Sequence, residues 1–180
     1  METHHLIAHP LAPPLGVSSV SAAIVRAAEG WIGLRWIVVG AQRLVVPALA
    51  GCGRADELWR TTCFELFVMA GEGPGYSEFN LSPSERWAAY DFSGYREGMT
   101  SRVVPRAPVC TWRGGGAAAI FDAAVPLSAL PAPPWHYGLS AVIEEEGGHR
   151  SYWALAQPPG QPDFHDRACF AGTLAAPAKS

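Results

Sequence analysis

The sequence has few charged residues and no cluster of basic ones. Only 16% of its 180 residues are charged, and the formal net charge at pH 7 is −3 with neutral histidines. Proteins that bind nucleic acids or anionic membrane surfaces usually carry a basic patch. The composition therefore argues against both kinds of partner.

Long apolar runs and leader-like segments are also missing. No apolar stretch reaches the roughly 20 residues that a membrane-spanning helix needs. The N-terminal residues METHHLIAHPLAPP have no cationic region followed by an apolar one, so they do not resemble a secretory signal. We therefore expect a cytoplasmic protein that does not enter a membrane.

Cysteine is scarce and scattered. Cys52, Cys63, Cys110 and Cys169 form no CxxC pair, which argues against a zinc site. A calcium loop of the DxDxDG type is missing as well. Disulfides are rare in reducing compartments, so we expect free thiols, with Cys63 as a small buried apolar residue.

Short strand-like segments fill the sequence, and helical periodicity is almost absent. Alternating apolar and polar residues, or clusters of β-branched and aromatic ones, predict strands at 17–28, 31–39, 61–69, 76–82, 85–92, 100–106, 117–125, 136–145 and 149–156. Turns separate them, for example EEEGGHR before the last strand, and PLSAL (126–130) predicts a short helical turn. The pattern predicts a single all-β domain over residues 1–180, an antiparallel β-sandwich of the Ig-like or jelly-roll type.

Two consecutive predicted strands carry carboxylates that can meet. Tyr76, Glu78 and Asn80 alternate onto one face of their strand, and Glu65 lies on the less apolar face of the preceding strand. If these strands pair through the turn at 70–75, Glu65 and Glu78 share a face of the sheet. That face is either solvated, as is normal for one side of an antiparallel sheet, or the floor of a binding site.

A third polar cluster lies in PDFHDRACF (162–170), where Asp163, His165, Asp166 and Arg167 crowd together. Asp–His pairs occur in catalytic dyads, but no serine or cysteine has a nucleophile signature such as GxSxG. The cluster either contributes to a site or only pins a C-terminal loop. Paired carboxylates with a histidine can hydrolyse a glycoside or bind sugar hydroxyls without reacting.

Tryptophan is unusually frequent, with seven residues. A sandwich core requires one or two, and exposed rings can stack on sugars or other flat ligands. Trp59, Trp87 and Trp153 are closest in sequence to the polar clusters and are the candidates for such a role. The alternative is that most of the seven pack in the core.

Three segments together resemble the DOMON-like ligand-binding domains: LWRTTCFELF (58–67), YSEFNLSPSERWAAYDFSGYREGM (76–99) and QPDFHDRACF (161–170). More narrowly, the chain is similar to their small stand-alone bacterial subgroup, which is related to family 9 carbohydrate-binding modules. The resemblance implies a non-catalytic β-sandwich that binds a sugar or sugar-like ligand. By position, it implies a pocket lined by Trp59, Glu65, Glu78, Asn80, Trp153 and His165.

The sequence is also compatible with two other functions. Some relatives bind haem, which would need axial ligands from among Met69, Met99, His136 and His165. A hydrolase would use Glu65, Glu78 and His165 as acid and base. We expect no resident metal or cofactor, and a homodimer is left open.

Overall fold

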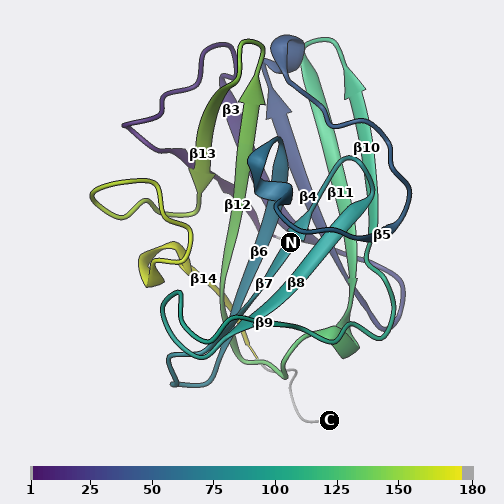
Figure 1. Ribbon diagram of the computed structural model, residues 1–180, viewed down its shortest axis with the longest axis vertical. Helices are drawn as coiled ribbons and strands as arrows, with labels where there is room; N and C mark the ends of the chain where they lie inside the picture. The colour runs from purple at the N-terminus through teal and green to yellow at the C-terminus, as the bar shows by residue number, and fades with distance from the viewer. Residues whose placement is uncertain (1, 176–180) are drawn as a thin grey trace.

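The structure, a computed structural model, describes residues 2–175 and contains two packed β-sheets (Figure 1). Residue 1 and residues 176–180, which the single-domain prediction includes, lie outside the described residues. The five-stranded sheet has the order β1-β3-β4-β11-β10. Its strands are β1 (Thr3–His5), β3 (Ser19–Val25), β4 (Trp31–Val39), β10 (Val109–Gly115) and β11 (Ala118–Pro126).

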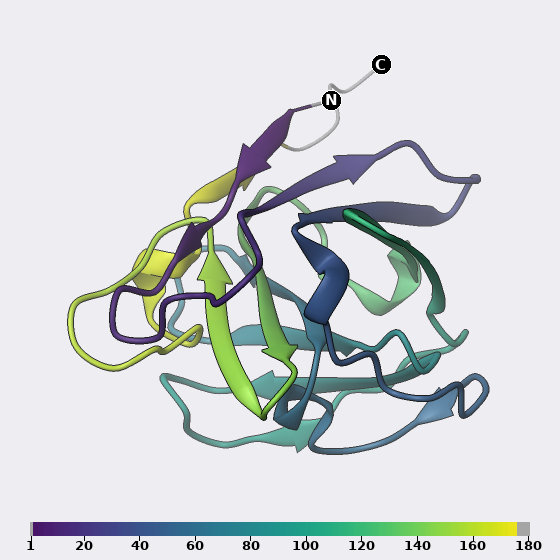
Figure 2. The same cartoon turned by 90° about the horizontal axis from the view of Figure 1, so that it is seen from above.

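The nine-stranded sheet has the order β2-β13-β12-β6-β7-β8-β5, with β14 beside β12 and β9 beside β8. Its strands are β2 (Ile7–Ala8), β5 (Gly53–Arg54), β6 (Cys63–Ala70), β7 (Tyr76–Leu81), β8 (Arg86–Phe92), β9 (Thr100–Ser101), β12 (Trp135–Glu145), β13 (His149–Ala154) and β14 (Gly172–Leu174). Seen from above, the two sheets form separate layers (Figure 2). The predicted β-sandwich is confirmed; the pairing of β5 with β8 is parallel, whereas the prediction was antiparallel throughout.

Alternation along the strands separates a core face from an outer face. On β6, Phe64 and Leu66 pack against the five-stranded sheet, where Phe64 stacks on Phe121 with ring centroids 4.4 Å apart. Glu65 and Phe67 point to the opposite side of the same strand. The outer face of the nine-stranded sheet is therefore the side on which the polar residues of β6 and β7 lie.

Part of this outer face is covered by the segment that follows β13. A second apolar cluster joins the sheet to this segment; its buried members are Phe67, Met69, Tyr76, Phe92, Val142, Ala154, Phe164, Cys169 and Phe170. The segment lies so close to β12 that a Cβ atom on Gly138 would sit 3.0 Å from the carbonyl oxygen of Cys169. Glycine at this position allows the segment to lie against the strand.

Most predicted strands and turns are confirmed. The hairpins β3–β4 and β12–β13 form as expected, and Gly147 and Gly148 adopt φ values of 93° and 80° in the second turn. The helical turn predicted at 126–130 is the 3-10 helix η3 (Leu127–Ala129). Within residues 2–175, no helix is long and apolar enough to cross a membrane.

The strand predicted at 100–106 is largely wrong. Only Thr100–Ser101 pairs with β8, as β9. Proline at position 105 has no N–H to donate to a ladder, and the guanidinium of Arg102 turns to the carbonyl of Ala129 and to Asp91. The sequence patterns did not indicate β1, β2, β5, β10 and β14, four of which have only two or three residues.

Candidate functional site

A cleft of about 940 Å³ opens on the outer face of the nine-stranded sheet. Its floor comes from β6, β7, β8 and β12, and its walls come from the loops around residues 11–12, 56–59, 96–101 and 161–165. The lining residues are Leu11, Ala12, Asp56, Glu57, Trp59, Glu65, Glu78, Asn80, Tyr90, Phe92, Arg96, Met99, Ser101, Val142, Tyr152, Gln161, Pro162, Asp163, Phe164 and His165.

The floor brings together three of the predicted polar residues. Glu65 pairs directly with Asn80 across β6 and β7, and Glu78 lies on the same face of β7. Only 3% of Glu65, 6% of Glu78 and 1% of Asn80 is exposed. The alternative of a solvated outer face is therefore wrong, because these groups are buried beneath the cleft.

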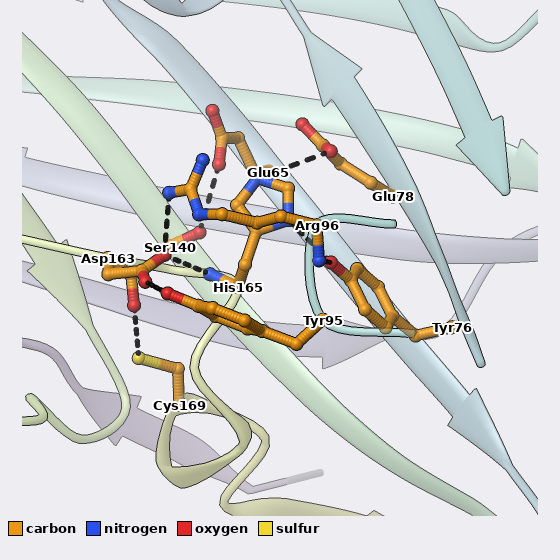
Figure 3. Close-up of polar contacts among 9 residues, drawn as sticks. All are labelled: Glu65, Tyr76, Glu78, Tyr95, Arg96, Ser140, Asp163, His165 and Cys169. Atoms are coloured by element: carbon orange, nitrogen blue, oxygen red, sulfur yellow. Dashed lines mark hydrogen bonds and ion pairs between the residues drawn. The ribbon is translucent and has the colours of Figure 1, made fainter. Parts of the chain in front are cut away.

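Hydrogen bonds among these groups leave acceptors without donors. The Nδ2 atom of Asn80 donates to Oε1 of Glu78 over 2.9 Å. The Oδ1 atom of Asn80 is buried and has no hydrogen-bond partner. The hydroxyl of Ser140 on β12 donates to Oε2 of Glu65 over a long 3.5 Å (Figure 3). An unpaired buried acceptor costs free energy, so this floor is suited to receive donors from a ligand.

Both carboxyl groups of the floor hold protons more tightly than usual. Burial, together with the charge of Glu78, raises the pKa of Glu65 well above its ordinary value, against the effect of the Ser140 hydrogen bond. Burial raises the pKa of Glu78 to about 7, against the effects of the Asn80 hydrogen bond and of the Arg96 charge. Near neutral pH, Glu78 is divided between its two forms, and Glu65 retains its proton to a higher pH than an ordinary glutamate does.

His165 lies over the floor in an aromatic surrounding. The rings of Phe67, Tyr76 and Phe92 contact its imidazole edge to face. Burial, followed by the positive charge of Arg96, lowers the pKa of His165 to about 4, although Asp163 acts in the opposite direction. The imidazole is therefore neutral at pH 7.

The two ring nitrogens of His165 face different partners. The hydroxyl of Tyr76 accepts a hydrogen bond from the backbone N–H of Arg96 and lies 2.7 Å from Nδ1 of His165. A neutral imidazole carries one proton, so when Nδ1 accepts from the Tyr76 hydroxyl the ring proton is on Nε2. That atom faces Oε2 of Glu78 at 3.7 Å (Figure 3).

Asp163 joins the two loops that form one wall. It accepts hydrogen bonds from Nη2 of Arg96 over 2.7 Å, from the hydroxyl of Tyr95 and from the backbone N–H of His165 over 3.0 Å (Figure 3). Burial acts to raise the pKa of Asp163, but the hydrogen bonds from Arg96 and Tyr95 lower it overall. The carboxylate therefore stays charged and holds His165 over the floor.

Trp59 supplies an exposed aromatic surface at the rim. It lies on the 3-10 helix η2 (Leu58–Arg60), which crosses the outer face of the sheet, and 49% of it is exposed. Two rim residues, Glu57 and Arg96, have left-handed backbone angles with φ of 58° and 55°. Strained conformations of this kind cost free energy and are concentrated at functional sites.

Trp153 does not belong to the cleft, although it was predicted there. It faces the core between the two sheets with 4% exposure, and its Nε1 donates to Oγ of Ser151 over 2.9 Å. Trp87 is buried in the same core and packs beneath Arg54. The other five predicted residues, Trp59, Glu65, Glu78, Asn80 and His165, all line the cleft.

The structure does not bring together the four residues that were considered as haem ligands. Of the four candidates, only Met99 and His165 line the cleft. Both ring nitrogens of His165 already face protein groups, namely Tyr76 and Glu78. The residues present therefore do not fit a haem. Among the described residues, no group of three or more His, Cys, Asp or Glu side chains is placed to hold a metal ion.

Several residues of the site were not predicted, including Asp56, Tyr90, Arg96 and Ser140. The hydroxyl of Tyr90 donates to Asp56 over 2.5 Å at the rim. The loop SGYREG, with arginine and tyrosine between glycines, was the one local signal for Arg96. Asp166, grouped with the cluster in the sequence, instead caps the 3-10 helix η4 (Arg167–Cys169).

Comparisons with known proteins establish the fold. The chain matches no family model, and no curated protein matches it in sequence. It is similar to the crystal structure of a candidate carbohydrate-binding protein from Bacteroides uniformis ATCC 8492, with a TM-score of 0.67 and 18% identity over 97% of this chain and 85% of that one.

Two further similar structures are of a family 9 carbohydrate-binding module from Caldicellulosiruptor kristjanssonii. The complex with glucose gives a TM-score of 0.55 and 9% identity over 94% of this chain and 81% of that one. The complex with cellotriose gives 0.54 and 10% identity over 99% and 84%. At these identities the likeness establishes a β-sandwich fold that the chain shares with such modules.

Proposed function

We propose that the chain is a non-catalytic binding domain whose cleft holds a carbohydrate or sugar-like ligand. The observation that carries this proposal is the floor, where Glu65, Glu78 and the unpartnered Oδ1 of Asn80 are buried below the exposed ring of Trp59. The fold shared with modules crystallised with glucose and cellotriose supports it. The resemblance to the DOMON-like bacterial subgroup points in the same direction.

The chemistry of the cleft suits a ligand with several hydroxyl groups. Hydroxyl protons can be donated to the free acceptors of the floor, which removes the cost of leaving them unpaired. The ring of Trp59 offers a flat apolar surface on which a sugar ring can stack. A volume of about 940 Å³ lies within the usual range for small-molecule sites.

A thermal-shift screen against mono- and oligosaccharides tests the proposal. A ligand present at 100 times its dissociation constant adds about 2.7 kcal/mol to the free energy of unfolding. We expect a sugar to raise the melting temperature of the wild type but not that of Trp59→Ala. Trp31→Ala is the matched control, since Trp31 lies on the other sheet beneath Arg106 and outside the cleft. A sugar that stabilises Trp59→Ala as much as the wild type would contradict the proposed site.

Acid–base hydrolysis of a glycoside is a second candidate, because Glu78, with a pKa of about 7, lies beside a second carboxyl group, Glu65, whose pKa is raised well above its ordinary value. Glycoside hydrolysis uses such a pair, one group as the acid and the other as the carboxylate. Turnover of aryl glycosides that is lost in Glu78→Gln would favour it over simple binding. Binding without turnover would favour the first proposal.

Several expectations stay predictions from the sequence. They are a cytoplasmic location, the lack of a resident cofactor and of a nucleic-acid partner, and the state of oligomerisation.

A further inference from the structure

When Glu65 and Glu78 are ionised, the floor of the cleft has more hydrogen-bond acceptors than donors. Its donor groups already serve its own carboxyl groups. Nδ2 of Asn80 donates to Glu78, and the hydroxyl of Ser140 donates to Glu65. The Oδ1 atom of Asn80, in a side chain that is 1% exposed, receives no donor. A ligand that binds the ionised form of this floor must therefore bring donors in excess of acceptors.

The charges that line the cleft are also unequal. Five carboxyl groups line it, those of Asp56, Glu57, Glu65, Glu78 and Asp163, against the single guanidinium of Arg96. Arg96 is paired with Asp163, and Glu57 is paired with Arg60 over 2.6 Å outside the floor. Among the ion pairs of residues 2–175, none joins Asp56, Glu65 or Glu78 to an arginine or a lysine.

We propose that the ligand carries an ammonium group, as an amino sugar does, and that this group binds to Glu65, Glu78 and Oδ1 of Asn80. The inference rests on the proposed function and names the ligand class of the same cleft. An ammonium group has three donors and no acceptor, which matches three acceptors. A sugar hydroxyl brings one donor but also an acceptor oxygen, and the ionised floor already has more acceptors than donors.

Burial strengthens the preference for a cation. An unpaired charge in a buried site is strongly unfavourable, and a partner of opposite sign with hydrogen bonds offsets that cost. Without ligand, the two glutamates avoid the cost by retaining protons, since burial raises the pKa of both. A bound ammonium would favour their ionised forms, so binding releases protons to the solvent.

Few other groups near the pair exchange protons close to neutral pH. The titratable and charged groups that face it are Cys63, Tyr76, Tyr90, Arg96 and His165, with Asp163 behind the histidine. Burial raises the pKa of Cys63, Tyr76 and Tyr90 and lowers that of His165 to about 4. Protons released near pH 7 therefore come from Glu65 and Glu78.

Isothermal titration calorimetry with matched sugars tests this inference. Glucosamine, N-acetylglucosamine and glucose differ only at one position, and the galactose and mannose series extend the comparison to other stereochemistries. We expect one amino sugar to bind at least tenfold tighter than its neutral parent and its N-acetyl derivative. We also expect its apparent enthalpy to differ between phosphate and Tris buffers, because protons are released, and that of the neutral parent to be unchanged.

Two variants test the residues. Glu65→Gln and Glu78→Gln, each shown to be folded by circular dichroism, are both expected to reduce the preference for the amino sugar to less than threefold. Glu72→Gln, on the exposed turn between β6 and β7, controls for the change in net charge and should retain the preference.

Equal or tighter binding of the neutral sugars would overturn the ammonium inference and leave the proposed sugar-binding function standing. Binding of cyclohexylamine with no binding of any sugar would retain the cation site and refute the sugar. No binding by any of these compounds to the folded protein would overturn both proposals.

Discussion

At the scale of single residues, Glu78 and His165 oppose each other in their response to pH. The two side chains lie 3.7 Å apart, and burial favours the neutral form of both, raising the pKa of Glu78 to about 7 and lowering that of His165 to about 4. Between pH 4.5 and 6.5 the native glutamate holds a proton that the unfolded chain releases, whereas the native histidine lacks one that the unfolded chain binds. Their contributions to the pH dependence of stability therefore tend to cancel in the wild type.

Replacing Glu78 by glutamine separates the two contributions. In the wild type, Glu78 reduces stability as pH rises from about 4.5 to 7, because the unfolded chain is then favoured by loss of its proton. Glu78→Gln removes this loss and retains an oxygen that can accept from Asn80. We expect the free energy of unfolding of the variant to increase relative to that of the wild type as pH rises over this range. Between pH 4.5 and 7.5 this relative gain should be roughly 2 kcal/mol. Urea denaturation at pH 4.5, 6 and 7.5 measures it.

Glu72→Gln on the exposed turn serves as the control for net charge in this experiment as well. A Glu78→Gln variant that loses stability relative to the wild type as pH rises would mean that the fold stabilises the carboxylate. In that case the interpretation of Glu78 as a buried acid that retains its proton would be wrong.

At the scale of elements, the wall of the cleft depends on one carboxylate between two loops. Asp163 holds the loop that carries Tyr95 and Arg96 against the segment that carries His165. We expect Asp163→Asn to weaken these contacts and lower the free energy of unfolding by about 1–3 kcal/mol. Hydrogen exchange should become faster in residues 93–98 and 161–167, while the exchange of β6 and β12 stays slow.

Asp122→Asn is a matched control for this loop experiment. Asp122 also accepts from two side chains, Arg35 over 2.6 Å and Arg113, but it lies on the five-stranded sheet. Its replacement should leave exchange in the cleft loops unchanged. Unchanged exchange in these loops after Asp163→Asn would show that the two loops hold together without this contact.

A buried glutamate holds the segment that leads into β3, a role that the sequence did not indicate. Glu145, at the end of β12, is fully buried, and its carboxylate accepts from the backbone N–H groups of Leu15, Gly16 and Val17 at 2.7, 2.6 and 3.3 Å. These hydrogen bonds attach residues 15–17, which lead into β3 of the five-stranded sheet, to β12 of the nine-stranded sheet. In the sequence it was only one of three glutamates before a turn.

Glu145→Gln should therefore destabilise the protein strongly. An amide in place of the carboxylate weakens charge-assisted hydrogen bonds and turns an NH₂ group toward backbone N–H donors. We expect a loss of about 2–4 kcal/mol in the free energy of unfolding, measured by urea denaturation. The neighbouring Glu144→Gln, which affects a side chain near Arg150 at 3.9 Å, should cost less than about 1 kcal/mol. Equal effects of both changes would contradict the role given to Glu145.

At the scale of the whole molecule, the nine-stranded sheet has two sides with different tasks. One side forms the core with the five-stranded sheet, and the other forms the cleft. Two tryptophans predicted for one pocket lie on opposite sides, Trp153 in the core and Trp59 at the exposed rim. Their replacement therefore has different consequences.

Trp153→Ala should lower the free energy of unfolding by about 3–5 kcal/mol, because it leaves a cavity between the sheets. Trp59→Ala should change it by less than about 0.5 kcal/mol, as is usual for exposed positions. Denaturation of both variants under one set of conditions gives the comparison. A small effect of Trp153→Ala would mean that its ring contributes little to the core.

The sequence by itself determined most strands and which residues share a face. Alternation is a local property of an extended chain, so Tyr76, Glu78 and Asn80 could be assigned to one face, and Glu65 to the corresponding face of its strand. The hairpin turns were equally local. For these reasons Glu65, Glu78 and Asn80 were correctly predicted to lie together.

Only the tertiary structure decided which face is covered and by what. Alternation places Trp153 on one side of β13 but does not say that this side is the core, because that depends on where the second sheet packs. The contacts of Asp163 with Arg96, and of Glu145 with residues 15–17, join positions 67 and about 130 residues apart. Such pairs depend on how the chain returns to itself, and the buried, proton-retaining state of the cleft floor follows from the same long-range packing.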